Sequence, residues 1–153
     1  MSVCFCLSEW QKKTLIMSNN DFLDIEEIIT TVMDCAAIVR KHLHAGYLEK
    51  IYEKALMIEL KEAGLTAESQ VDLNVSYKGE ILGVFTVDIL VEKRLIVELK
   101  ATKDISPIHE MQVVNYLTTT GIDDGLIINF GNENSIQFRR KYRIYRPKGH
   151  KKQ

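Results

Sequence analysis

Hydrophobic residues recur at three- and four-residue steps in two consecutive segments near the N-terminus. This spacing places apolar side chains on one face of a helix. Gly46 separates the two segments, and Gly64 follows the second. Glycine commonly ends helices. We therefore predict two amphipathic helices, over residues 21–44 and 47–63.

Shorter apolar runs follow, with the spacing of strands. Residues 70–77 alternate between apolar and polar, as in a strand with one buried face. Residues 81–91 and 95–101 are apolar runs joined by a charged turn, so they predict a β-hairpin. Residues 125–130, GLIINF, are apolar enough for a strand buried on both faces, and a last strand is predicted over residues 136–143.

A third helix is predicted between the hairpin and the last two strands. Pro107 suits the first position of a helix, and Gly121 follows its predicted end at Thr120. We read Gly121, Gly125 and Gly131 as turn residues. The resulting order, ααβββαββ, predicts a mixed α/β fold, in which a central β-sheet is flanked by helices.

Composition narrows the class of protein. The chain of 153 residues is 46% hydrophobic and 27% charged, which is typical of a single globular domain. It has no apolar run near the ~20 residues of a membrane span and no signal-peptide pattern. We expect a cytoplasmic protein with no membrane partner. Residues 1–20 are interpreted as a poorly ordered leader, and translation starting at Met17 instead of Met1 is a second interpretation.

The cysteines give no sign of a disulfide framework or a zinc site. There are three, and Cys4 and Cys6 form a CxC, whereas Cys35 falls in the first predicted helix. No CxxC or Cys/His pair has zinc spacing. We interpret the CxC as part of the leader.

Charge is distributed unevenly along the chain. The net charge is -1, but residues 139–153 hold eight of the 20 Lys and Arg and none of the 21 acids. The first 138 residues therefore carry 12 - 21 = -9. We treat residues 141–153 as a basic tail. It suits either contact with a phosphate backbone or solvation of the terminus.

Three charges interrupt the predicted hairpin. Glu98 and Lys100 are two residues apart, so they share one face of a strand, and Asp88 lies on the preceding strand. A structural ion pair is one explanation. The other is chemical, because two carboxylates can hold Mg²⁺ and a lysine can act on a water beside a phosphoryl group.

Further motifs extend this pattern. Asp88 with Glu98-Leu99-Lys100 resembles the D…(D/E)xK signature of the PD-(D/E)XK nuclease superfamily. The stretch GYLEKIY, residues 46–52, resembles the GxxExxY family within it, as do PIHEMQ (107–112), NYL (115–117) and LIINFG (126–131). The resemblance covers roughly residues 25–140 and implies a restriction-endonuclease-like core over residues 21–140.

The resemblance implies a role for each matching residue. Asp88 and Glu98 would hold a metal ion together with the backbone carbonyl of Leu99, and Lys100 would act on the attacking water. Glu49 would reach the same metal directly or through water, and Gln112 would position substrate or water. Two neighbours are assigned to the surroundings of this site. Tyr52 is interpreted as a packing or hydrogen-bonding residue. His109, close to a proline at a helix start, is interpreted as an exposed or capping residue, with a place behind the metal ligands as the alternative.

The implied function is a nuclease that uses Mg²⁺, or Mn²⁺ in its place, to hydrolyse DNA or RNA. The alternative is a non-catalytic module that keeps the fold and binds nucleic acid or protein. The acidic body favours this alternative, or a partner subunit, because a nuclease usually offers phosphate a positive surface. A homodimer is a further expectation, since small nucleases of this type often dimerise.

Overall fold

The computed structural model describes residues 23–143. The predicted leader with its CxC, the start at Met17 and residues 144–153 of the predicted tail lie outside this range. The described elements are α2 (Ile25–Leu43), α3 (Glu49–Glu62), β1 (Ala67–Tyr77), β2 (Glu80–Val91), β3 (Leu95–Lys100), α4 (Pro107–Thr120), β4 (Asp124–Asn129) and β5 (Gln137–Tyr142). This order confirms the predicted ααβββαββ.

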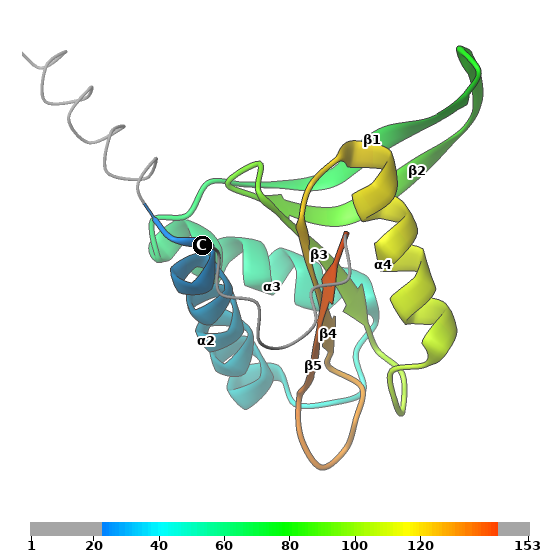
Figure 1. The fold of residues 1–153 in the computed structure, drawn as a ribbon. Helices are drawn as coiled ribbons and strands as arrows, with labels where there is room; N and C mark the ends of the chain where they lie inside the picture. The colour runs from blue at the N-terminus through cyan, green and yellow to red at the C-terminus, as the bar shows by residue number, and fades with distance from the viewer. Residues whose placement is uncertain (1–22, 144–153) are drawn as a thin grey trace, which may run out of the picture.

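The strands form one sheet in the order β1-β2-β3-β4-β5. Neighbours are antiparallel except β3 and β4, which are parallel and joined through α4. A parallel pair requires such a crossover connection. Helices α2 and α3 cover one face of the sheet and α4 covers the other (Figure 1). The predicted mixed sheet flanked by helices is confirmed.

Alternation along β3 distributes its side chains between the two faces. Val97 and Leu99 are buried in the core beneath α2 and α3, whereas Ile96 is buried against α4. Because successive side chains of a strand point to opposite faces, Glu98 and Lys100 lie on the α4 side. The structure thus confirms that these two charges share a face.

Strand β4 is buried along its whole length. Gly125 lies inside this strand, so its interpretation as a turn residue was wrong. A Cβ at this position would lie 2.6 Å from Val113 Cγ1 of α4. Gly125 therefore allows α4 to approach the sheet closely. Gly121, by contrast, ends α4 with φ 73°, as predicted.

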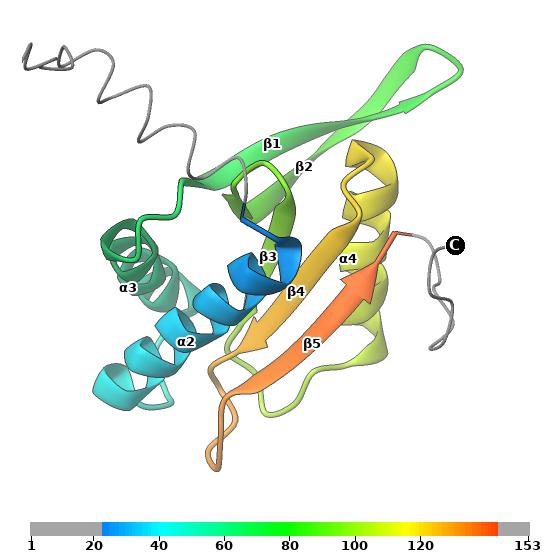
Figure 2. The same cartoon turned by 60° about the vertical axis from the view of Figure 1, so that its left-hand side comes forward.

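The β1-β2 hairpin extends beyond the body of the sheet (Figure 2). Val71 and Leu73 pack against the α4 side of the core, as their alternation predicts. The register shifts between Val75 and Ser76, and Tyr77, expected on the same face, is 61% exposed. The first half of β2 is also exposed, although its apolar sequence suggests burial.

The ends of three elements differ from the prediction by two residues or more. Helix α2 begins at Ile25 because Asp24 is its N-cap, and the Asp24 backbone N–H donates to Glu27 Oε2 at 3.0 Å. Helix α3 begins at Glu49, two residues later than expected, and β1 begins at Ala67, three residues earlier. Within residues 23–143, no helix combines the length and apolar content that a membrane crossing needs.

Candidate active site

The site lies where β2 and β3 part. Their pairing covers three positions, from Ile89↔Val97 to Val91↔Leu95. Beyond it, the Leu99 backbone N–H donates to Asp88 Oδ2 at 2.7 Å. The Asp88 carboxylate thus accepts the hydrogen bond that a backbone carbonyl of β2 would accept if the two strands stayed paired. Asp88 is held against β3 by this bond rather than by regular strand pairing.

Glu98 and Lys100 form an ion pair beside Asp88. Lys100 Nζ lies 3.1 Å from Glu98 Oε1, and Glu98 is only 4% exposed. Glu98 Oε2 is buried and has no hydrogen-bond partner within the described part of the chain. A buried carboxylate oxygen without a partner is costly. Lys100 therefore satisfies only half of this carboxylate, and the other oxygen is free for a ligand.

Gln112 of α4 joins the same group. Its Oε1 accepts a hydrogen bond from Lys100 Nζ at 3.3 Å, and its Nε2 donates to the Tyr116 hydroxyl at 2.5 Å. Tyr116 lies in the NYL stretch noted in the sequence, but no role was assigned to it. Its spacing of one helical turn from Gln112 was the available signal. The hydrogen bond to Tyr116 fixes the orientation of the Gln112 amide, and the amide oxygen then holds the ammonium group of Lys100.

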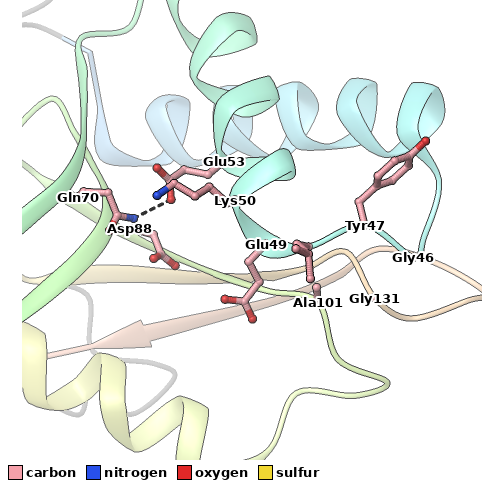
Figure 3. A pocket seen from close by; sticks show the side chains of 10 residues that line it. Gly46, Tyr47, Glu49, Lys50, Glu53, Gln70, Asp88, Ala101 and Gly131 are labelled. Atoms are coloured by element: carbon pink, nitrogen blue, oxygen red, sulfur yellow. Dashed lines mark hydrogen bonds between the residues drawn. The ribbon is translucent and has the colours of Figure 1, made fainter.

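Helix α3 brings two carboxylates to the opposite side of Asp88. Glu49 opens the helix and Glu53 lies one turn further on. Both line a cavity of about 610 Å³ that Asp88 and Gln70 also line (Figure 3). Glu53 Oε2 accepts a hydrogen bond from Gln70 Nε2 at 2.7 Å. The sequence analysis assigned no role to Glu53 or Gln70. The helical spacing between Glu49 and Glu53 was a signal for Glu53, whereas nothing in the sequence marks Gln70 as a site residue.

The carboxylates hold their protons more tightly than usual. Burial raises the pKa of Glu98 to about 7, with the Asp88 charge as the next cause, while Lys100 acts in the opposite direction. Burial also raises the pKa of Asp88, against the Leu99 N–H, and the charges of Glu53 and Glu49 add to the rise. Without a bound cation, the site thus carries unfavourable negative charge.

The same charges act on Lys100 and Tyr116. Burial by itself lowers the pKa of Lys100, but the charge and hydrogen bond of Glu98, with Glu49 and Asp88, raise it above its ordinary value. Lys100 is therefore an ammonium group at neutral pH. Burial and then the Glu98 charge raise the pKa of Tyr116, so its hydroxyl keeps its proton.

The donor atoms suit a hard divalent cation. Within residues 23–143, no three Asp, Glu, His or Cys side chains are already gathered tightly enough to hold a metal. Two carboxylates nevertheless perturb one another, and one of their oxygens is buried without a partner. Oxygen donors of this kind are those that Mg²⁺ prefers. The residues present therefore fit a cation held by Asp88 and Glu98.

Tyr52 supports the loop that leads into α3. Its hydroxyl donates to the His44 carbonyl at 2.7 Å and accepts the Tyr47 N–H at 3.1 Å. Its ring stacks on Phe130 with 4.5 Å between centroids. These contacts are those of a packing and hydrogen-bonding residue. They hold the segment from which Glu49 extends.

His109 lies in the cap of α4. Its Nδ1 accepts the Ser106 backbone N–H at 3.2 Å. Within residues 23–143, His109 makes no hydrogen bond to Asp88, Glu98 or Lys100. The structure therefore gives this histidine a capping role at the start of α4.

The loop after β3 is fastened to the end of β4. Asn129 Oδ1 accepts the backbone N–H groups of Thr102, at 3.0 Å, and Gly131, at 3.1 Å. A Cβ at Gly131 would lie 2.4 Å from the Ala101 carbonyl carbon. Only glycine allows this approach, and Ala101 and Gly131 both line the cavity. Asn129 was missed because it lies inside an apolar strand.

Comparison with known proteins identifies the family of this chain. No curated protein matches the sequence. A solved structure described as the crystal structure of SSO0001 is similar, with 16% identity and a TM-score of 0.48 over 90% of this chain and 77% of that chain. A family model described as the PD-(D/E)XK nuclease superfamily matches residues 26–141, from the start of α2 into β5. The chain therefore belongs to the PD-(D/E)XK nuclease superfamily.

Proposed function

We propose that this protein is a Mg²⁺-dependent nuclease of the GxxExxY family that hydrolyses phosphodiester bonds in DNA or RNA. The observation that carries the proposal is the buried Glu98 Oε2 without a partner, next to Asp88 and Lys100. A purely structural ion pair would satisfy both carboxylate oxygens. A site that receives a cation requires a free one.

The residues divide into two groups. Asp88 and Glu98, with the Leu99 carbonyl, would hold Mg²⁺ or Mn²⁺, and Glu49 of α3 would reach the same ion directly or through water. When bound, the cation lowers the pKa of water and neutralises charge on the phosphoryl group. Lys100, kept as an ammonium group, orients the attacking water and stabilises the negative charge of the transition state. Gln112 holds Lys100 in place.

The alternative function is a non-catalytic module that binds nucleic acid or protein. One observation favours it: the first basic residues of the C-terminal stretch are already engaged with acids. Arg140 pairs with Asp124 and Glu26, and Lys141 pairs with Glu110. Their charges are therefore largely balanced. In this case a homodimer or a partner protein in the cytoplasm would supply the positive surface.

Cleavage assays with several substrates separate the two functions. Plasmid, single-stranded DNA, duplex DNA and RNA are incubated with Mg²⁺, Mn²⁺ or EDTA, using the parent and Asp88→Ala. The nuclease proposal predicts metal-dependent cleavage by the parent and a loss of at least 10²-fold in Asp88→Ala, as expected for removal of an electrostatic catalyst. If the parent and Asp88→Ala show the same cleavage activity, the nuclease proposal is wrong and the non-catalytic binding module is the remaining function.

A further inference from the structure

Gln70 has an unusual backbone for a residue in a strand. Its φ is +54°, in the left-handed region that favours glycine, although it lies within β1. Ser69 pairs with Ile89 and Val71 with Val87, so the register places Gln70 opposite Asp88. Strain of this kind persists where the surrounding structure imposes it, and it concentrates at functional sites.

The side chain of Gln70 is oriented by a buried carboxylate. Glu53 is 7% exposed, and its Oε2 accepts the Gln70 Nε2 hydrogen at 2.7 Å. An ionised carboxylate only accepts hydrogen bonds. The amide therefore turns its NH₂ group toward Glu53 and its carbonyl oxygen away from it. Figure 3 shows the pair on the same side of the cavity as Asp88.

The rest of the amide is unused. Within residues 23–143, neither Oε1 nor the second N–H of Gln70 makes a hydrogen bond. Gln70 is exposed in the cavity of about 610 Å³ whose lining also includes Glu49, Asp88, Ala101 and Gly131. This volume falls in the range of sites that bind small molecules.

We propose that Gln70 reads the base of an unpaired nucleotide in this cavity, and that Glu53 is the positioning residue that fixes its amide. The inference rests on the proposed function, because a cation held by Asp88 would place the scissile phosphate beside the cavity. A carboxamide offers one donor and one acceptor side by side, which matches the edge of a base. Unpaired bases are recognised in this way on their exposed edges.

Equilibrium binding of labelled oligonucleotides tests the proposal. Homopolymers of each of the four bases, as DNA and RNA and as single strands and duplexes, are titrated against Asp88→Asn, which prevents cleavage. The proposal predicts stronger binding of single strands and an affinity for the preferred base at least about fivefold above the others. Adding Gln70→Gly should bring the four affinities within twofold of one another.

Thermal stability distinguishes this role from a structural one. Glycine relieves the left-handed strain but also leaves the buried Glu53 carboxylate without its donor. Because these two effects oppose each other, Gln70→Gly should change the melting temperature little while base discrimination is lost. Asn74→Gly is the matched control, since Asn74 is an exposed β1 residue with regular pairing to Val84. It should lower the melting temperature and leave the base preference intact.

Glu53→Gln tests the positioning role. The amide introduced by Glu53→Gln can either accept or donate a hydrogen bond, so it no longer fixes the orientation of the Gln70 amide, and base discrimination should fall. In the Gln70→Gly background the same change should have no further effect on discrimination. If Gln70→Gly keeps the base ranking of the parent, the inference is wrong while the nuclease proposal stands. If the parent binds no oligonucleotide, both are wrong.

Discussion

Asp88 is the residue whose charge and hydrogen bond can be separated by mutation. Its carboxylate accepts the Leu99 N–H, and burial with the charge of Glu53 raises its pKa. Asp88→Asn keeps an acceptor for Leu99 and removes the negative charge. In metal-free buffer we expect the variant to gain roughly 1 kcal/mol in the free energy of unfolding, the size of a partly screened like-charge contact.

Urea denaturation in EDTA measures this gain. Asp88→Ala is the matched variant, because it removes the acceptor as well, and it should lie below Asp88→Asn by about 1 kcal/mol, the typical value of one hydrogen bond. A structural ion-pair role predicts the opposite sign for Asp88→Asn. A clear loss of stability in that variant would therefore argue against a cation site.

Glu98 makes the stability of the metal-free protein depend on pH. Burial and the Asp88 charge raise its pKa from the ordinary 4.5 to about 7. The folded protein thus binds a proton that the unfolded chain releases between these values. Stability from this group is complete below about pH 4.5 and is lost as pH rises through 7.

Thermal melts between pH 4.5 and 8 in EDTA measure this dependence. Glu98→Gln should flatten the profile between pH 5 and 7, because its side chain does not titrate. Saturating Mg²⁺ should also flatten it for the parent, since a bound cation favours the ionised carboxylate. Parent and Glu98→Gln profiles of the same slope would contradict this account.

Tyr52 supports the site without belonging to it. Its hydroxyl bonds to the backbone of His44 and Tyr47, just before Glu49. We expect Tyr52→Phe to lose about 1–2 kcal/mol of unfolding free energy, because two backbone groups lose a partner. Chemical denaturation measures the loss. The stabilisation by Mg²⁺ should remain, whereas a variant that folds normally and no longer responds to Mg²⁺ would make Tyr52 part of the metal site.

At the level of elements, the sequence predicted the order of helices and strands because their periodicities are distinct. It also placed Glu98 and Lys100 on one face, since strand alternation is a local property. It did not predict that β2 and β3 separate at Asp88, because the departure of β2 toward the extended hairpin depends on tertiary structure.

The site residues to which the sequence assigned no role also depend on tertiary structure. Gln70 occupies a left-handed conformation that its sequence does not signal, and it meets Glu53 from an element 17 positions away. Asn129 reads as part of an apolar strand, and Gly131 as a turn. Their roles come from contacts with the loop after β3, which are long-range in sequence.

The packing of α4 on β4 can be tested by replacing glycines with alanine. A Cβ at Gly125 would lie 2.6 Å from Val113 Cγ1 and 3.3 Å from Leu117 Cδ1. Gly125→Ala should therefore cost about 1–3 kcal/mol by overpacking. Because α4 also carries Gln112, its displacement should weaken the contact with Lys100.

Gly83→Ala is the matched control, as a Cβ there meets nothing within 4 Å. It should leave stability unchanged or raise it by up to about 1 kcal/mol. Both variants are compared by urea denaturation. Equal stabilities of the two would show that α4 does not pack on Gly125 as described.

At the level of the whole molecule, the sheet brings two sets of polar side chains together from opposite faces. Glu98, Lys100 and Gln112 come from the α4 side, while Glu49 and Glu53 come from α3. Asp88 lies between them where β2 and β3 part. The fold thus concentrates carboxylates at one end of β3, and a cation there would relieve their repulsion.

Calorimetric titration with Mg²⁺ and Mn²⁺ measures directly whether these carboxylates bind a cation. We expect the parent to have one or more sites and to release protons on binding near pH 7, because binding ionises Glu98. Asp88→Asn should lower the affinity at least about tenfold, as for loss of a ligand or its close support. If the parent binds neither ion, or if Asp88→Asn binds them as tightly as the parent, Asp88 and Glu98 do not form a metal site.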